Sequence, residues 1–378
     1  MRKRYFLKSK IFAIIILIIS NTLIPIVCGI NVDNYDLTKT SQILKISRVQ
    51  NNINNNDNTK YYALIAACSE YKDKRNNLPK PPLPPFPEKK LKYVYDSLIK
   101  SDNWDEENII LLLNSNATKD NIVQALIQIS EILGPDDIFI FSWNGHGSKV
   151  LDVDGDEAFF DPDDTYDEII CPYDIEKTDD SFVNALTDDE LDILFSNINC
   201  KGMCLMFESC LSGGLVDVKA SQKDMLDLNG ENRIVITSTL PDSLGRANFL
   251  TCSSLLSSIS FAFSGFAKDS NNDGFISVEE AFKIARPLAI LQSSLYWVGL
   301  WGILSLYYKL GLIENSVIPP PSFMIDLFKT YPLFFATLSI IESYIVIQKF
   351  IKFTTGNKMI NWPNIHDDYE GELLIIEI

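Results

Sequence analysis

The sequence is short of histidine, and this narrows the chemistry that it can perform. Only two of its 378 residues are histidines, and its seven cysteines do not stand at the spacing of a tetrahedral zinc site. A zinc centre built from Cys and His is therefore not expected. A reaction that needs an imidazole as its general base must use His146 or His366.

Positive charge is scarce as well. Lys and Arg number 33 against 50 Asp and Glu, which gives a formal net charge of −17 at pH 7. Such a surface repels the phosphates of nucleic acid, so we expect no nucleic-acid partner. The same charge suits a secreted protein, calcium binding or a basic substrate. Nothing in the sequence indicates an organic cofactor.

Two apolar runs end next to a reactive side chain. Residues 203–207 are followed by Glu208-Ser209-Cys210, and residues 137–143 lead to His146, which stands between two glycines. Short apolar runs of this kind are typical of buried strands, and the ends of parallel strands lie at the mouth of an α/β sheet. The two motifs together predict a Cys-His pair. Taken alone, the Cys210 motif also fits a cysteine in the core, and the His146 motif also fits a simple turn.

These motifs resemble those of the caspase-like cysteine peptidases, the group that contains metacaspases, their prokaryotic relatives and legumain. Prokaryotic metacaspase-like peptidases are the most similar in pattern. The resemblance covers 60–286 and resumes at 362–378. It implies a three-layer α/β/α sandwich with a mostly parallel six-stranded sheet. The segments that carry it are 61–66, 114–122, 141–148, 167–174, 187–191 and 208–214.

The resemblance also implies a role for each residue of the pair and its neighbours. His146 would assist Cys210 in attacking a peptide carbonyl, and the backbone N–H groups of Gly147 and Cys210 would form the oxyanion hole. Glu208 would meet a basic P1 side chain, Arg or Lys, and Glu70 would add a second charge to that pocket. An Asn-specific, legumain-like peptidase and an inactive calcium-binding surface protein are the alternatives. His366 is the rival base, which we place in a loop with a surface or structural role.

Two acidic segments are candidates for calcium. Between 152 and 168 the sequence holds nine acids and no basic residue, which fits either a solvated loop or a cation site. Residues 269–280 match the twelve-position calcium loop, with Gly274 at the sharp turn. A hydrated turn that caps the next helix is the plainer interpretation. The predicted ligands are Asp269, Asn271, Asp273, Phe275 through its carbonyl, Ser277 and Glu280.

The rest of the chain divides by composition. Residues 1–29 carry five positive charges and then an apolar run, as a signal peptide or an anchor does. An Asn-rich linker at 30–59 precedes the peptidase domain at 60–378.

Helices are expected at 88–101 and 119–132, with Thr118 as the N-cap of the second. We therefore expect an exported protein, extracellular or on the outer face of the cell membrane, that acts on protein or peptide substrates.

The segment 288–350 departs from the family pattern. It contains two apolar runs, 288–308 and 330–347, separated by three prolines. Each run approaches the length that crosses a bilayer, so we predict an inserted apolar helical hairpin and association with a membrane. A pair of soluble helices laid on the domain is the alternative. The sequence does not indicate an oligomeric state.

Overall fold

The computed structural model describes residues 59–78, 91–152, 165–178, 181–216, 228, 230–245, 253–290, 292–293 and 362–378. All of these residues belong to one compact unit, which comprises Ser41–Ser293 and Lys358–Ile378. The predicted targeting segment, nearly all of the linker, the proline-rich segment 79–87 and most of 288–350 lie outside the described residues.

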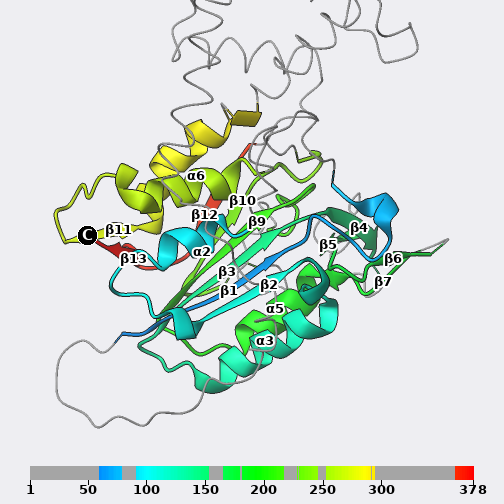
Figure 1. Cartoon of the computed structure of the whole chain (residues 1–378), viewed down its shortest axis with the longest axis horizontal. Coiled ribbons are helices and arrows are strands. Elements are labelled where there is room, and N and C mark those ends of the chain that lie inside the picture. The colour runs from blue at the N-terminus through cyan, green and yellow to red at the C-terminus, as the bar shows by residue number, and fades with distance from the viewer. Residues whose placement is uncertain are drawn as a thin grey trace, which may run out of the picture. The chain divides into compact units, whose positions relative to one another are not determined.

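A six-stranded sheet forms the centre of this unit (Figure 1). The five strands from β10 to β2 are parallel, and β12 runs antiparallel to β10. Strands β1, β3 and β9 are buried along their whole length, because helices cover both faces of the sheet. The predicted mostly parallel six-stranded sheet is confirmed. In spatial order its strands are β12 (Asn364–Asp367), β10 (Arg233–Thr237), β9 (Gly202–Glu208), β3 (Ile138–Asn144), β1 (Tyr61–Ala67) and β2 (Ile109–Leu113).

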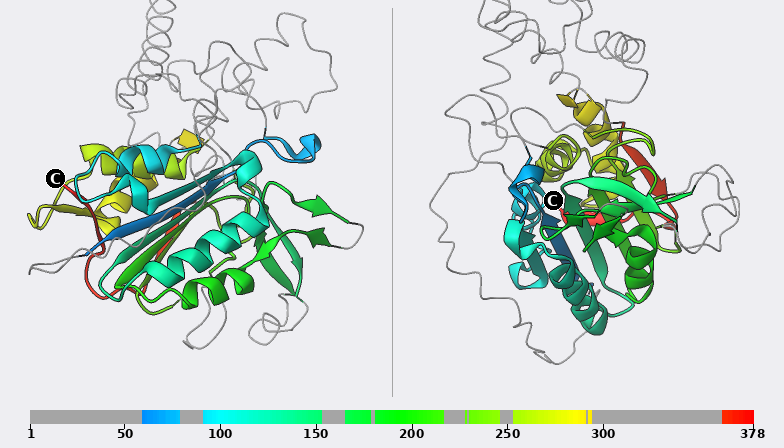
Figure 2. Two further views of the ribbon diagram at one scale, coloured as in Figure 1. Left: turned by 60° about the horizontal axis from the view of Figure 1, so that its bottom comes forward. Right: turned by 90° about the vertical axis from the view of Figure 1, so that its right-hand side faces the viewer.

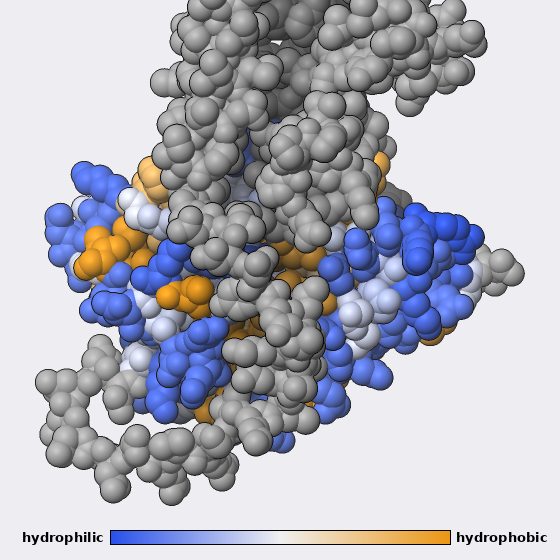
Figure 3. All heavy atoms as spheres, in the orientation of Figure 1, coloured by the Kyte–Doolittle hydropathy of each residue, from blue (hydrophilic) through white to orange (hydrophobic). Residues whose placement is uncertain are grey.

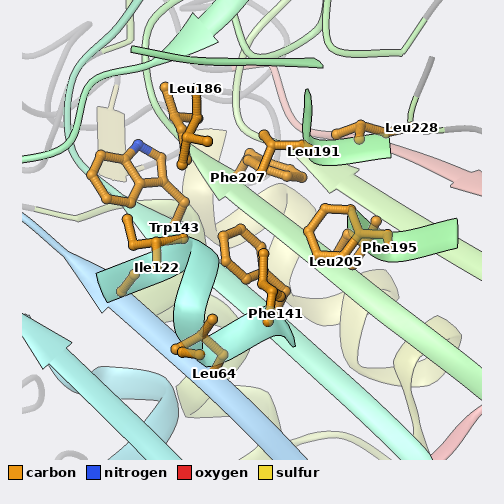
Figure 4. Packing of buried hydrophobic residues seen from close by; sticks show 14 of the residues in the cluster. Leu64, Ile122, Phe141, Trp143, Leu186, Leu191, Phe195, Leu205, Phe207 and Leu228 are labelled. Atoms are coloured by element: carbon orange, nitrogen blue, oxygen red, sulfur yellow. The ribbon is translucent and has the colours of Figure 1, made fainter. Parts of the chain in front are cut away.

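Two helical layers enclose the sheet (Figure 2). Helices α3 (Lys119–Ile132) and α5 (Asp188–Ser196) share a core with Leu64 of β1, and Figure 4 shows this packing. Helices α2 (Tyr93–Leu98) and α6 (Leu255–Phe261) share the opposite core with Ile65. Neighbouring residues of one strand thus face opposite layers, as the period of two requires.

Threonine caps begin the two helices of the first layer. The Thr118 hydroxyl accepts from the Asn121 N–H, so the predicted N-cap of α3 is confirmed. Thr187 and Glu190 form a reciprocal capping box at the start of α5. Of the helix expected at 88–101, residues 91–101 are described, and within them only α2 is an α-helix.

Short strands complete the described structure. Strands β4 (Gly147–Leu151), β5 (Tyr166–Ile170) and β8 (Leu186–Thr187) form an antiparallel sheet, and β6 (Glu176–Lys177) pairs with β7 (Phe182–Val183). Strand β11 (Phe275–Ser277) pairs with β13 (Leu374–Glu377). Single helical turns lie at η2 (Lys74–Asn76), η3 (Glu106–Asn108), η4 (Asn114–Asn116) and η5 (Ala262–Phe266).

The C-terminal segment corrects one prediction. The expected loop around His366 is a strand, β12, which pairs antiparallel with β10 and forms the edge of the central sheet. The following strand, β13, belongs instead to the small sheet with β11. A four-residue edge strand has too short a pattern to be distinguished from a loop by sequence alone.

The apolar insertion is described only at its beginning. Residues 278–290 are helical, so the helix that follows the calcium-like loop continues into the first apolar run. Within the described ranges, no helix is both long and apolar enough to cross a membrane. Hydrophilic residues cover most of the described surface on the face drawn in Figure 3. The predicted hairpin itself falls outside the described residues.

A nearly buried ion pair connects α5 to β10, and its removal should destabilise the fold. The Arg233 guanidinium, 5% exposed, donates to Asp192, whose side chain is 13% exposed. The Asp192→Ala change should lower the free energy of unfolding by about 3 kcal/mol, because it leaves a buried cation with weaker partners. Urea unfolding measures this, with the exposed Glu131→Ala of α3 as control. Equal midpoints for the two variants would contradict the prediction.

Candidate active site

The pairing register of β3 and β9 places the two predicted catalytic residues side by side. Asn144 and Glu208 are the last paired residues of the two strands. His146 and Cys210 each follow their strand by two residues, at the same edge of the sheet. The two turns are in contact, since Gly145 N–H donates to the Glu208 carbonyl over 3.2 Å. The structure therefore brings together the two turns that carry the imidazole and the thiol indicated by the sequence motifs.

Glycine at 147 is required by the closeness of the two turns. A Cβ built on Gly147 would lie 2.3 Å from the Cys210 carbonyl oxygen. The preceding carbonyl, of His146, accepts from the Cys171 N–H at the end of β5. Because the C=O and N–H of one trans peptide point in opposite directions, the Gly147 N–H is directed away from Cys171. This direction suits the predicted oxyanion donor.

The imidazole is oriented by residues that the sequence did not indicate. The Nε2 atom of His146 lies 2.8 Å from the carbonyl oxygen of Asn76. A carbonyl only accepts, so this contact assigns the proton to Nε2 and makes Nδ1 the basic nitrogen. The His146 N–H donates to the Tyr71 hydroxyl over 2.8 Å. Every residue has a backbone carbonyl, so the amino-acid type at position 76 could not indicate this role.

The turn that carries Cys210 is held by serine and threonine. The Ser212 hydroxyl accepts from the N–H groups of Ser238 and Thr239. The hydroxyls of those two residues donate to the Ser209 carbonyl. A Cβ on Gly213 would lie 2.5 Å from the Thr239 carbonyl oxygen, so glycine is required here too. These contacts fix the backbone on both sides of the thiol.

Cys210 and Cys200 are the two described cysteines that are partly exposed. The Cys210 thiol lies 3.9 Å from the Gly245 carbonyl oxygen. Burial raises the pKa of Cys68 and of Cys171 to about 12, and that of Cys200 to about 11. Thiols with such pKa values stay protonated at neutral pH and are poor nucleophiles.

Glu208 occupies a position other than the predicted one. Its side chain is 6% exposed, and its two oxygens accept from the backbone N–H groups at the start of α6. The hydroxyls of Ser253 and Ser254 also donate to it. The carboxylate therefore caps a helix N-terminus, where the dipole favours negative charge. Sequence reasoning missed this because the contact joins residues more than forty positions apart.

Glu70, the second predicted pocket residue, is exposed. It follows β1, and its backbone N–H donates to the Asn114 side chain over 3.1 Å. Glu70 belongs to the segment that contacts His146 through Tyr71 and Asn76. His366 lies elsewhere, paired with Val235 within β12 and β10, and burial lowers its pKa. The structure does not bring His366 to the thiol.

Part of the first acidic segment packs beside the cysteine turn. Asp167, Glu168 and Asp188 are buried, and the Glu168 N–H donates to the Asp188 carboxylate over 3.2 Å. A Cβ on Gly214 would lie 2.3 Å from the Glu168 carboxyl carbon. The predicted acidic loop thus reaches the segment that carries Cys210, although 153–164 lie outside the described residues.

The second acidic segment turns at Gly274, where the sequence pattern predicted the sharp turn. Gly274 has a φ of 88°, and the Asp269 carboxylate accepts from the Gly274 N–H over 3.0 Å. The Glu280 carboxylate accepts from the N–H groups of Ser270 and Ser277. The turn and the oxygen donors fit a hard divalent cation. Within the described ranges, however, no three His, Cys, Asp or Glu side chains are grouped closely enough to hold a metal ion.

The part of the chain that carries this site is similar to known proteins. Residues 88–219 match the family described as metacaspase, peptidase C14 domain. Metacaspase-1A of Aspergillus oryzae is 33% identical over 123 residues, which are 30% of this chain and 27% of the relative. Metacaspase-4 of Arabidopsis thaliana is 29% identical over 136 residues, 34% of this chain and 29% of the relative. The chain thus spans less than a third of the length of these relatives.

Two solved structures are similar at a lower level. A protein of Geobacter sulfurreducens has a TM-score of 0.41 at 16% identity, over 60% of this chain and 88% of its own. Caspase-1 of Spodoptera frugiperda has a TM-score of 0.43 at 10% identity, over 88% of this chain and 98% of its own. The segment that matches the family contains His146, Cys210 and the strands that position them. The matched segment 88–219 is therefore similar to a metacaspase-type peptidase C14 domain.

Proposed function

We propose that this protein is a cysteine endopeptidase. The observation that carries the proposal is the position of the His146 imidazole, held by the Asn76 carbonyl at the strand end next to Cys210. Nδ1 of His146 accepts the thiol proton, and the thiolate attacks the peptide carbonyl. The N–H groups of Gly147 and Cys210 stabilise the oxyanion. The imidazolium then protonates the leaving amine, and water releases the acyl group from the sulfur.

Loss of either reactive side chain should abolish amide hydrolysis. Cys210→Ala and His146→Ala should each lower kcat by at least a hundredfold, and the double variant should be little worse, because the two groups act as a unit. Steady-state hydrolysis of a fluorogenic peptide measures this. His366→Ala is the control and should keep full activity. Loss of activity in His366→Ala with retention in His146→Ala would refute the assignment.

The alternative of an inactive surface protein is tested by a different readout. A thiol-reactive peptide probe should label Cys210, and the labelling should require His146. An inactive protein would show either no labelling of Cys210 or labelling that does not depend on His146. We favour the enzyme because both reactive residues are present and their turns are in contact.

We further propose a preference for Arg or Lys at P1, and we assign it to Glu70. The Glu208 carboxylate caps α6, whereas Glu70 is exposed and belongs to the segment that contacts His146. An exposed carboxylate can pair with a cationic side chain that approaches the thiol. An Asn-specific site is the alternative, for which the charge of Glu70 would not matter.

Neutralising Glu70 should therefore change specificity, whereas neutralising Glu208 should change stability. Glu70→Gln should lower kcat/KM for Arg and Lys peptides by about tenfold and leave Asn peptides nearly unchanged. Glu208→Gln should lower the melting temperature, because it weakens the cap of α6. A panel of peptides with Arg, Lys, Asn and Asp at P1 measures the first effect. Equal losses on Arg and Asn in Glu70→Gln would refute the assignment.

Calcium is the metal that we propose for the segment 269–280. Its oxygens and its turn at Gly274 fit this ion, and Glu280 lies in the first turn of the helix at 278–290. Calcium bound there would brace the helix that packs on α6. Export and association with a membrane remain predictions, because they depend on residues 1–29 and 288–350.

The calcium site is tested by the increment that calcium adds to stability. Calcium should raise the melting temperature of the wild type, and Glu280→Gln should lose most of that rise, since a closing ligand loses its charge. The increment is the readout, because the substitution alone also alters the hydrogen bond to Ser277. Glu131→Gln is the control and should keep the full increment. An unchanged increment in Glu280→Gln would move the site to 152–168.

A further inference from the structure

The segment 68–78, which we name the clamp segment, is folded back on itself after β1. The Leu78 N–H donates to the Ser69 carbonyl over 2.9 Å, and the Tyr71 N–H donates to the Asn77 side chain over 2.7 Å. The Asn114 side chain, at the end of β2, accepts from the N–H of Ser69 over 3.0 Å. Asn114 has a φ of 48°, so its own backbone is held in the left-handed region. The clamp segment is thus anchored to the sheet on the far side from Cys210.

The clamp segment contacts His146 at three places. Besides the Asn76 carbonyl on the ring nitrogen, Tyr71 makes the other two contacts. Its hydroxyl accepts from the His146 N–H, and its ring lies against the imidazole with centroids 5.1 Å apart. One side chain therefore holds both the backbone and the ring of the same residue.

The fit around the Tyr71 hydroxyl is close. A Cβ on Gly145 would lie 3.0 Å from this oxygen and 2.6 Å from the Trp143 ring. Tyr71 is 3% exposed, so its hydroxyl must be satisfied within the protein. It also forms a hydrogen bond with the thiol of Cys68, and that thiol donates to the Glu70 carbonyl over 3.1 Å. A chain of hydrogen bonds therefore extends from the His146 backbone through Tyr71 and Cys68 to Glu70.

A buried tyrosine with a satisfied hydroxyl is often only part of a core. Here the hydroxyl is directed at the residue that the proposed reaction needs, and the ring limits how that imidazole can turn. Cys68 is fully buried, and its raised pKa keeps the thiol protonated as a donor. These contacts favour a role in orienting the base over a role in packing alone.

We propose that Tyr71 is a positioning residue for His146, and that the clamp segment holds the imidazole in the orientation that accepts the proton of Cys210. The proposal rests on the proposed function of the pair. It adds that the base is fixed from outside the two strands that carry the pair. The Tyr71 hydroxyl supplies this constraint through the backbone of His146, and the ring supplies it through the imidazole.

The test compares Tyr71→Phe with Tyr95→Phe. Tyr95 is also buried, and its hydroxyl also forms a hydrogen bond, to Glu106. It lies on α2, in the core on the other side of the sheet from Tyr71, so it is a matched control for the loss of a buried tyrosine hydroxyl. Tyr71→Phe should lower kcat by between about ten- and a hundredfold with little change in KM, because misplacing a base costs rate and not binding. Tyr95→Phe should keep kcat within about twofold. Similar losses of kcat in both variants would overturn the proposal.

A second readout does not need substrate. The rate at which iodoacetamide alkylates Cys210, followed by mass spectrometry of its peptide, reports the thiolate as a function of pH. Tyr71→Phe should move this profile to higher pH, since a poorly held imidazolium stabilises the thiolate less. A loss of stability alone would leave the profile of the folded protein in place, and that result would overturn the proposal.

Variants at Cys68 extend the test along the hydrogen-bond chain. Cys68→Ser keeps a group that can both donate and accept, whereas Cys68→Ala removes it. Cys68→Ala should lower kcat and shift the alkylation profile in the same direction as Tyr71→Phe, and Cys68→Ser should restore most of both. Equal kcat values and equal alkylation profiles for the two Cys68 variants would contradict the role of this series of hydrogen bonds.

The outcomes also separate this proposal from the function on which it rests. If alkylation of Cys210 depends on His146 but not on Tyr71, the pair stands and the positioning role is wrong. If alkylation is the same in the wild type and in His146→Ala, the pair itself is wrong, and the positioning role fails with it.

Discussion

The alignment of β3 with β9 is the constraint on which the site depends. These parallel strands are hydrogen-bonded neighbours. Their last paired residues, Asn144 and Glu208, place the two following turns at the same edge of the sheet. A shift of one residue in this register would separate the two turns and exchange the faces that the shifted strand presents to the two cores. The cores on the two sides of the sheet therefore maintain the catalytic geometry as well as the fold.

The close approach of the two turns demands small residues and dense backbone bonding. Glycine at 147 and 213 leaves room where a Cβ would overlap a carbonyl oxygen. Ser212 with the residues at 238 and 239 ties the cysteine turn to the end of β10. The rigidity of the site thus comes from main-chain contacts, which is a form of pre-organisation.

Patterns within one element were predictable, and contacts between distant elements were not. Apolar runs before His146 and Cys210 indicated β3 and β9, and Thr118 indicated the start of α3. The carbonyl that orients His146 comes from Asn76, where the amino-acid type carries no information. Glu208 was assigned to a substrate because its partners at the start of α6 are remote in sequence. Strand β12 was missed because four residues at an edge show too little periodicity.

The capping of α6 by Glu208 has a consequence for the order of folding. Within the described residues, the N-terminus of α6 receives no capping bond from the side chain of its own N-cap residue, Ser254. Its first two orphan N–H groups, of Leu255 and Leu256, are satisfied by a carboxylate at the end of β9, and that of Ser257 is satisfied by the Ser253 hydroxyl. A seven-residue helix is too short to be stable alone in water. We therefore expect α6 to form late, after β9 has joined the sheet, and to be among the first elements to open when that strand end is disturbed.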